Sequence, residues 1–273
     1  MRILVTGGAG KVATSLRSRL VADGRVLRLF DVVRPHELDG TGPEEVVLGS
    51  LADPDAVAAA CDGVDAIVHL GGQSKEADAG DVLRANALGT YHLLETARRQ
   101  GVKRLMLASS SHAAGFHLRD VATYPDGLPA TLPARPDTLY GWSKAAAESL
   151  AGLYADRFGL DVICVRIGLW FPVPPQNRGL ATWLSPDDGA RLVEACLSAP
   201  SPGFRIVWGV SRNTRRWWSL AEGEAIGYFP KDDAEVFAAE RIAEFGEPDF
   251  DNDPDLNRVG AWWCDWPLAQ RMG

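Results

Sequence analysis

The sequence predicts an α/β fold with a doubly wound parallel sheet and a small irregular C-terminal lobe. Short apolar runs alternate with helix-length amphipathic stretches through residues 1–167, a rhythm typical of strand–helix–strand units around a parallel sheet. A glycine-rich turn joins the first apolar run to the first amphipathic stretch. Beyond residue 168, prolines and most of the nine tryptophans interrupt the rhythm, which indicates the irregular lobe.

Six apolar runs are expected to form the strands of the sheet, in chain order. Each is short, rich in Val, Ile and Leu, and bounded by residues that favour turns. They cover residues 3–6, 26–30, 45–48, 66–70, 104–108 and 162–167. A seventh run, 204–208, lies in the lobe and is expected to return to the same sheet.

Four stretches between these runs have the length and pattern of helices, at residues 11–22, 55–61, 79–100 and 139–158. Pro54 stands where a helix begins. Gly101 and Gly159 directly follow two of the stretches, where a left-handed cap that ends a helix is expected.

Charge and composition exclude several classes of partner. Of 273 residues, 46% are hydrophobic and 23% are charged, which is typical of a globular chain. The formal net charge of −8 offers no basic surface for nucleic acid or an anionic membrane. With no apolar stretch of about 18 residues, no signal-peptide pattern and four widely spaced cysteines, the sequence predicts a cytoplasmic protein with reduced thiols.

The glycine-rich turn at residues 6–13 is the first candidate site. Its glycines fit G-x-x-G-x-x-A from Gly7 and Gly10, and also G-x-G-x-x-A from Gly8 and Gly10. Such a turn lets backbone N–H groups approach a pyrophosphate at the positive end of the helix that Lys11 and Val12 open. A purely structural turn is the alternative interpretation.

An acidic residue at the end of the second strand supplies the other half of a dinucleotide site. Asp31 follows the run 26–30 at the distance expected for the carboxylate that binds the ribose 2′-hydroxyl. A carboxylate there repels a 2′-phosphate, so NAD is expected rather than NADP. Arg34 is the residue that could reverse this preference by pairing with a phosphate.

A serine, a tyrosine and a lysine form the candidate catalytic group. The run 104–108 ends in three serines, and Tyr140 and Lys144 lie four residues apart on one helix face. A nearby ammonium and the positive nicotinamide ring favour the phenolate, so the tyrosine can accept a proton. A serine at the strand end can hold the reacting oxygen.

On these motifs the chain resembles the extended short-chain dehydrogenase/reductases of the NAD-dependent epimerase/dehydratase superfamily, and within them the uronate dehydrogenases. The resemblance runs over almost the whole chain and includes segments of the lobe, such as residues 182–183, 187–188 and 217–218. It implies a Rossmann-type fold with a nucleotide-binding domain over 1–167 and a substrate-binding region over 168–273. It also implies NAD-dependent oxidation of C1 of galacturonate or glucuronate.

The resemblance assigns roles to individual residues. It makes Ser110 the catalytic serine, Tyr140 the base and Lys144 its partner. Substrate contacts are expected from Ser74, Ser110, Ser111, His112, Tyr140 and Arg178. Cofactor contacts are expected from Gly7, Gly10, Lys11, Val12, Asp31, Leu51, Leu70, Gly71, Tyr140, Lys144 and Ile167.

The roles that the resemblance implies for Arg178 and His112 can be checked against the chemistry of the implied substrate. A uronate carries a carboxylate, and an arginine fork can bind one through two charge-assisted hydrogen bonds. A surface arginine is the alternative for Arg178. His112 is either a substrate hydrogen-bond partner, an acid/base group or a packed side chain, and His69, at the end of an apolar strand, is expected to line the site or the core.

Three positions depart from the family pattern. Ser111 stands where asparagine is usual, Leu169 where serine is usual, and Ser50 where an aspartate usually contacts adenine. The first two make an oxidoreductase acting on a different sugar or hydroxy compound the main rival hypothesis. A non-catalytic NAD-binding regulator is the remote one, because such proteins typically lose the tyrosine or the lysine.

The remaining predictions concern metals, partners and packing. No histidine pair has the spacing of a zinc site, so no metal is expected. A small sugar acid is the expected partner, and a homo-oligomer through the helices at 79–100 and 139–158 is expected. Asn86 is interpreted either as the residue that fixes a helix bend or as a plain buried amide. Core or lobe packing is expected for Trp142, Trp183, Trp217 and Trp218, and stacking of one of them on a sugar face is the alternative.

Overall fold

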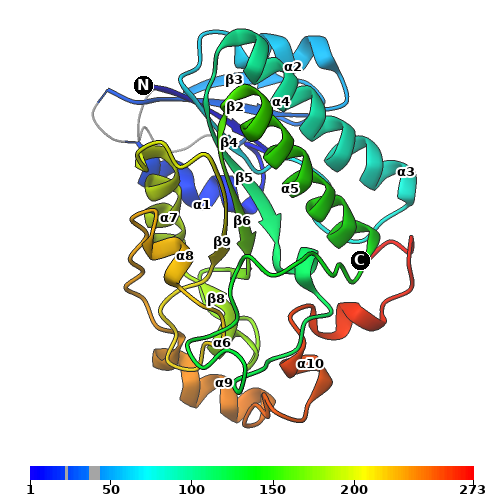
Figure 1. Cartoon of the computed structure of the whole chain (residues 1–273), viewed down its shortest axis with the longest axis vertical. Coiled ribbons are helices and arrows are strands. Elements are labelled where there is room, and N and C mark those ends of the chain that lie inside the picture. Colours follow the sequence, from blue (N-terminus) through cyan, green and yellow to red (C-terminus); the bar gives the residue numbers. More distant parts are fainter. Residues whose placement is uncertain (22–23, 37–43) are drawn as a thin grey trace.

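A computed structural model describes residues 1–21, 24–36 and 44–273. Its centre is a seven-stranded parallel sheet with the order β3-β2-β1-β4-β5-β6-β9, the doubly wound arrangement that the sequence predicts (Figure 1). The strands are β1 (Arg2–Thr6), β2 (Val26–Asp31), β3 (Glu44–Leu48), β4 (Ala66–His69), β5 (Arg104–Ser110), β6 (Asp161–Ile167) and β9 (Phe204–Gly209).

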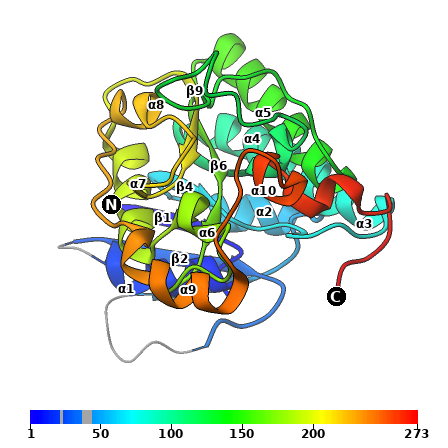
Figure 2. The same ribbon diagram turned by 90° about the horizontal axis from the view of Figure 1, so that it is seen from below.

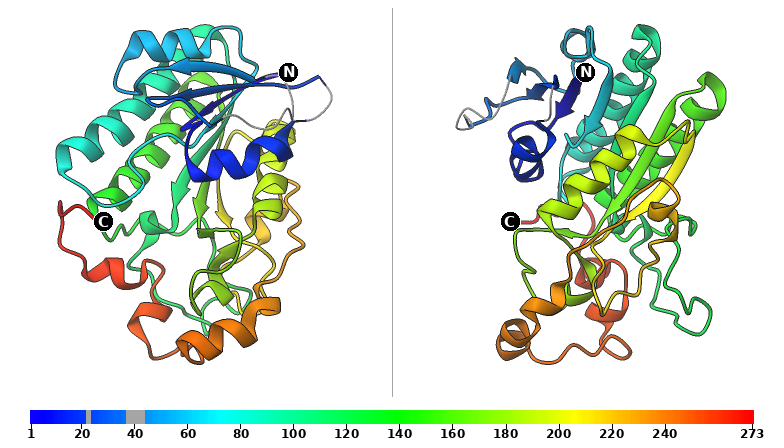
Figure 3. Two further views of the ribbon diagram at one scale, coloured as in Figure 1. Left: turned by 180° about the vertical axis from the view of Figure 1, so that it is seen from behind. Right: turned by 90° about the vertical axis from the view of Figure 1, so that its left-hand side faces the viewer.

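Helices cover both faces of this sheet (Figures 1 and 3). On one face lie α1 (Lys11–Leu20) and α7 (Pro186–Ser198), and on the other lie α2 (Pro54–Cys61), α4 (Gly89–Gln100) and α5 (Leu139–Phe158). Because a parallel sheet has helices on both sides, its strands are apolar on both faces. This explains why the strand sequences are near-continuous apolar runs.

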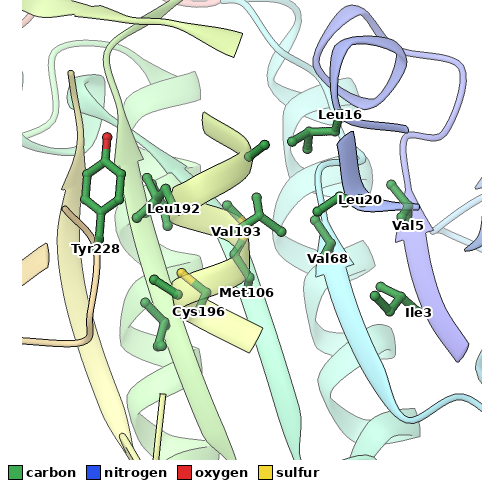
Figure 4. Packing of buried hydrophobic residues seen from close by; sticks show 14 of the residues in the cluster. Ile3, Val5, Leu16, Leu20, Val68, Met106, Leu192, Val193, Cys196 and Tyr228 are labelled. Carbon is green, nitrogen blue, oxygen red and sulfur yellow. The ribbon is translucent and has the colours of Figure 1, made fainter. Parts of the chain in front are cut away.

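Two apolar cores fill the space between the sheet and these helices. The first joins α1 and α7 to the sheet, and its members include Leu16 of α1, Leu192 and Val193 of α7, and Val68 and Met106 of the strands (Figure 4). The second joins α2, α4 and α5 to the opposite face. The sheet is therefore fixed on both sides, and its strand ends provide a rigid edge.

The predicted strands agree with the structure to within two residues, and β5 shows the largest difference. It continues past residue 108 through Ser109 and Ser110, which pair with Arg166 and Ile167 of β6. The sequence did not predict this extension because both residues are polar. Parallel pairing uses backbone groups, so a polar side chain is tolerated in the strand where it has a hydrogen-bond partner. Ser109 Oγ finds one by donating to the buried carboxylate of Glu148 at 2.5 Å.

The predicted helix at 79–100 is interrupted. It consists of α3 (Ala79–Val82), a π-helical segment (Leu83–Leu88) and α4. Asn86 lies in the π-helical segment and its side chain bonds outside the helix, to the backbone of Gln73 and to Ser143 Oγ. These contacts are tertiary, so the periodicity of the sequence does not reveal the interruption.

Helix ends follow the predicted capping residues. Gly101 and Gly159 have φ of 78° and 69°, in the left-handed region, and Pro54 is the first residue of α2. The Asp53 side chain caps α2 by accepting from the N–H groups of Asp55 and Ala56. The helix α1 ends at Leu20, and Ala22, where the prediction ended, lies outside the described residues.

The lobe is built from short elements beyond β6, and β9 leaves it to pair with β6 at the edge of the sheet. Its third apolar core contains Trp208 stacked on Trp218, with ring centroids 4.5 Å apart. In Figure 2 the lobe is seen from below, with α9 and α10 on either side of α6. The remaining elements are β7 (Leu169–Trp170), β8 (Trp183–Leu184), α6 (Gly179–Thr182), α8 (Ala221–Glu224), α9 (Ala238–Phe245), α10 (Pro254–Asn257) and three 3₁₀ turns at Ser111–Ala114, Ala234–Phe237 and Ala261–Asp265.

None of the helices within the described ranges is both long enough and apolar enough to span a membrane. The four cysteines, all of them described, are free thiols, and three of them are buried.

Candidate active site

A cavity of about 910 Å³ lies at the carboxyl ends of the strands, between the sheet and the lobe. Its walls include residues at or just after the ends of five strands: Gly7, Asp31, Leu70, Ser110 and Ile167. Ligands of doubly wound sheets bind outside these strand ends. The volume is at the upper end of the range for ligand pockets, about 300–1,000 Å³.

The glycine-rich turn is packed too tightly for side chains. Gly7 has φ of +68°, and a Cβ on it would lie 2.8 Å from the backbone nitrogen of Gly71. A Cβ on Gly8 would lie 2.8 Å from Leu29 Cβ. Gly10 is the N-cap of α1, and no side chain caps that helix end. The turn therefore leaves the first N–H groups of a ten-residue helix for an anionic group of a ligand.

Asp31 ends β2 at the wall of the same cavity. Its Oδ2 accepts from the N–H of Ala9 at 2.9 Å and its Oδ1 from the N–H of Val32 at 2.7 Å. These bonds hold the carboxylate against the glycine-rich turn. Arg34 is exposed and lies outside the cavity lining, so it does not offset the negative charge of Asp31 there.

The other residues expected at a dinucleotide line the same cavity. Lys11, Val12, Leu51, Leu70, Gly71 and Ile167 are all in its wall. Gly71 also packs too tightly for a side chain, because a Cβ on it would lie 2.9 Å from Leu51 Cδ1. An extended dinucleotide fits this combination of a helix N-terminus, an apolar wall and a carboxylate.

Tyr140 and Lys144 lie in the first two turns of α5, and both are buried. Tyr140 lines the cavity beside Ser110, whereas Lys144 lies behind it. The Lys144 Nζ is 5.7 Å from the centroid of the Tyr140 ring and donates to the Ala108 carbonyl oxygen at 2.8 Å. The structure therefore brings Ser110, Tyr140 and Lys144 together.

In the protein without its cofactor, the pKa of Tyr140 is raised above its ordinary value. Burial raises the pKa of Tyr140 to about 12, a hydrogen bond with Ser110 lowers it, and the Asp137 carboxylate raises it. Burial also lowers the pKa of Lys144 to about 8. Desolvation disfavours the charged form of both groups, and it is the largest cause of both shifts.

His112 is held on two sides. Its Nδ1 is 2.6 Å from Asp137 Oδ2, and its ring stacks on Trp263 with centroids 3.8 Å apart. The Asp137 carboxylate is fully buried, and a Cβ on Gly115 or Gly260 would collide with it. His112 is therefore a fixed side chain of the cavity wall, oriented by a carboxylate through one ring nitrogen.

Arg178 is a buried cation in the cavity wall. Its guanidinium donates to the carbonyl oxygens of Arg258 at 3.3 Å and Val259 at 2.5 Å. Within the described ranges no ion pair joins it to a carboxylate. Burial lowers its pKa to about 10, which the charges of Asp137 and Asp255 offset only in part. The site therefore contains a desolvated positive charge beside open space.

The last predicted substrate positions also line the cavity. Ser74 is exposed and Ser111 is buried, and both are in the wall. Leu169 of β7 is a half-buried part of the same wall, and Ser50 accepts from the N–H of Ala52 at 3.2 Å. All the predicted site residues except Lys144 thus meet in one cavity.

Sequence reasoning missed several residues that build this wall. Trp262 and Trp263 line the cavity, although they lie in a short C-terminal turn far from every motif. The Trp-Trp doublet was the one available signal. The packing predictions hold for Trp183, Trp217 and Trp218, but that for Trp142 is wrong, because it lies on the solvent side of α5 with 43% of its surface exposed.

His69 is a core residue. Its Nδ1 is 2.7 Å from Thr6 Oγ1 and its Nε2 is 3.2 Å from Thr90 Oγ1, and the side chain is buried. Burial, with a smaller contribution from the charge of Lys144, lowers its pKa to about 3. Across the described part of the chain, no three His, Cys, Asp or Glu side chains are grouped so that they could hold a metal ion.

The low pKa of His69 predicts a pH dependence of stability. The unfolded histidine, with a pKa near 6.5, binds a proton that the folded protein excludes until about pH 3. The free energy of unfolding is therefore expected to fall by up to about 1.4 kcal/mol per pH unit below pH 6.5 from this group. Urea unfolding of His69→Asn should show a shallower pH dependence than the wild type. Parallel curves for the two proteins would contradict the assignment.

The chain as a whole is similar to known dehydrogenases. A model of the NAD dependent epimerase/dehydratase family matches residues 3–184. The chain is 42% identical over 271 residues to a uronate dehydrogenase of Pseudomonas syringae pv. tomato, covering 99% of this chain and 96% of that one.

The chain is also similar to solved structures of dehydrogenases. The chain is similar to glucuronic acid dehydrogenase from Chromohalobacter salexigens, with 38% identity, a TM-score of 0.90 and 98% of each chain covered. It is equally similar to a mutant uronate dehydrogenase from Agrobacterium tumefaciens complexed with NAD, with 40% identity, a TM-score of 0.88 and 99% of each chain covered.

Proposed function

The chain belongs to the NAD dependent epimerase/dehydratase family, and we propose that it oxidises C1 of a hexuronate, galacturonate or glucuronate, to an aldarolactone with NAD. Arg178 is the observation that carries this proposal. A buried guanidinium without a carboxylate partner in the described residues, in the wall of a cavity that also contains Ser110 and Tyr140, suits an anionic sugar. The uronate carboxylate would supply the missing negative charge.

The cofactor site uses the glycine-rich turn and Asp31. The uncapped N-terminus of α1 suits the pyrophosphate, and Asp31 suits a ribose diol. When bound, NAD supplies a nicotinamide ring that accepts a hydride. The carboxylate of Asp31 disfavours a 2′-phosphate, which agrees with NAD rather than NADP.

The proposed reaction removes a hydride from C1, which NAD would accept, and a proton from the C1 hydroxyl, which the Tyr140 phenolate would accept. The C1–H bond breaks with its electron pair as hydride, the hydroxyl proton passes to Tyr140 Oη, and the C1–O bond becomes the lactone carbonyl. Ser110 holds the reacting oxygen by a hydrogen bond. Tyr140 and Ser110 are adjacent in the cavity, so one oxygen can contact both.

Lys144 supports the proton transfer from behind the phenol. Its pKa of about 8 leaves the amine protonated at neutral pH, so an ammonium faces the Tyr140 ring. That charge favours the phenolate against the burial that raises the Tyr140 pKa to about 12. The Ala108 carbonyl fixes the ammonium where this support is needed.

Substrate selection depends on local charge. A protein with a net charge of −8 does not attract a uronate by its overall field. Arg178 supplies a local cation, and His112, Ser74 and Ser111 offer hydrogen bonds to sugar hydroxyls. Leu169 makes part of the wall apolar, which is the observation that favours the rival substrate, a different sugar or hydroxy compound.

We also propose a division into two regions, a cellular location and an oligomeric state. Residues 1–167 carry the cofactor site, and 168–273 contribute Arg178, Leu169 and Trp263 to the sugar pocket. The enzyme works in the cytoplasm, which suits four free thiols. It forms a homo-oligomer through α4 and α5, which is supported by the exposed Tyr91 and Leu153.

Replacing the base should separate binding from turnover. Tyr140→Phe removes only the phenol oxygen, so kcat should fall at least about 100-fold while the Kd for NAD stays unchanged. Steady-state NAD reduction and fluorescence titration with NAD measure the two effects. Tyr124→Phe, which lies outside the cavity, is the matched control. Full activity of Tyr140→Phe would reject the role of the tyrosine.

Removing the cation should discriminate between charged and neutral sugars. Arg178→Ala is expected to lower kcat/KM for galacturonate about 100-fold or more, because two charge-assisted hydrogen bonds are lost. The effect on galactose should be small. Arg212→Ala, an exposed arginine away from the cavity, controls for net charge. Equal losses for galacturonate and galactose would remove the carboxylate clamp and favour the rival substrate.

A further inference from the structure

Glu76 is a fully buried carboxylate that the catalytic scheme does not use. Its Oε2 accepts from the N–H of Tyr140 at 2.8 Å, and its Oε1 accepts from the N–H of Ala269 at 2.8 Å. Its own carbonyl oxygen accepts from the N–H of Met272 at 3.0 Å. One residue thus binds the start of α5 and the end of the chain at the same time.

The bond to Tyr140 fixes the backbone of the proposed base. Tyr140 is the second residue of α5, so its N–H has no partner within the helix. The Thr138 side chain caps Gly141, one residue further on, and leaves the Tyr140 N–H to Glu76. A carboxylate at a helix N-terminus is also favoured by the helix dipole. The position of the phenol therefore depends on Glu76.

The other two bonds dock the C-terminal segment, residues 266–273. Met272 is buried, Arg271 pairs with Asp81 at 2.7 Å, and Lys75 Nζ donates to the carbonyl oxygen of Gly273. The end of the chain accordingly lies beside α3 and the start of α5 in Figures 1 and 3. This segment directly follows the turn that places Trp262 and Trp263 in the cavity wall.

We propose that Glu76 is a positioning residue that couples the placement of Tyr140 to the docking of the C-terminal segment. Its two carboxylate oxygens each satisfy one backbone donor, so the loss of one bond leaves a buried oxygen without a donor and loosens the side chain that makes the other bond. Docking of the C-terminal segment and placement of the base are then one event. The role of Tyr140 rests on the proposed function, whereas the coupling itself is a property of the contacts.

A small displacement of Tyr140 is enough to affect catalysis. A reacting atom displaced by about 1 Å can cost about 100-fold in rate. Glu76 is buried and has no cation within ion-pair distance in the described ranges, so both oxygens depend on backbone N–H donors. An amide at this position keeps one acceptor and turns a donor toward the other N–H. Glu76→Gln therefore removes one of the two bonds while conserving volume.

The test is a double-mutant cycle between Glu76→Gln and a truncation that removes residues 268–273, with galacturonate and NAD as substrates. Each single change should lower kcat about 10-fold or more, with the KM for galacturonate and the Kd for NAD within about 3-fold of the wild type. The double variant should lose no more than the worse single variant, because both act through one contact. Glu240→Gln, an exposed glutamate of α9, is the control.

Hydrogen exchange provides a readout that does not need turnover. Glu76→Gln should speed exchange of the amides of 266–273, and the truncation should speed exchange at 139–143. A loss of kcat in the double variant equal to the product of the two single losses would overturn the coupling. Unchanged exchange in either segment would also overturn it. If Glu76→Gln does not fold, the truncation and its exchange at 139–143 decide alone. A wild type inactive with every uronate would reject the proposed function, and exchange would still decide the coupling.

Discussion

Tyr140 and Lys144 are both removed from water in the first two turns of α5, and the site depends on that burial. Burial favours the neutral form of each group, raising the pKa of the phenol to about 12 and lowering that of the amine to about 8. In the proposed mechanism a proton passes between substrate and phenol, which requires neighbours that support the charged forms. Ser110 supports the phenolate and the Ala108 carbonyl supports the ammonium.

The same helix is held to the sheet by a buried ion pair. Glu148 of α5 binds Arg166 of β6 through two bonds of 2.9 Å and 2.8 Å, and also accepts from Ser109 of β5. These contacts fix α5 relative to the two strands whose ends carry Ser110 and Ile167. Breaking such a pair by removing one partner typically costs about 3–5 kcal/mol, because a buried charge is left alone. The placement of the proposed base is thus part of the stability of the fold.

The features that depend on residues close together in the sequence were predicted correctly. The strand runs, the caps at Gly101 and Gly159, and the glycine turn depend on neighbouring residues, and the structure agrees with them. Glu76, Asp137 and Trp263 were not recognised, because their partners lie far away in the chain: Ala269, His112 and again His112. The π-helical segment around Asn86 agrees with the interpretation of this residue as one that fixes a helix bend, which came from the family resemblance and not from the periodicity. Spacing alone also did not show that burial raises the pKa of Tyr140, because spacing shows a nearby charge but not desolvation.

The proposal that a buried cation selects a sugar acid is tested most directly with the unmodified protein. Absorbance of reduced nicotinamide is recorded after mixing the protein with NAD or NADP and, in turn, galacturonate, glucuronate, galactose and glucose. We expect rapid reduction of NAD by a uronate and slow or no reduction with NADP or with either neutral sugar. Equal rates with neutral sugars, or no reduction by either uronate in a protein that binds NAD, would contradict the proposal.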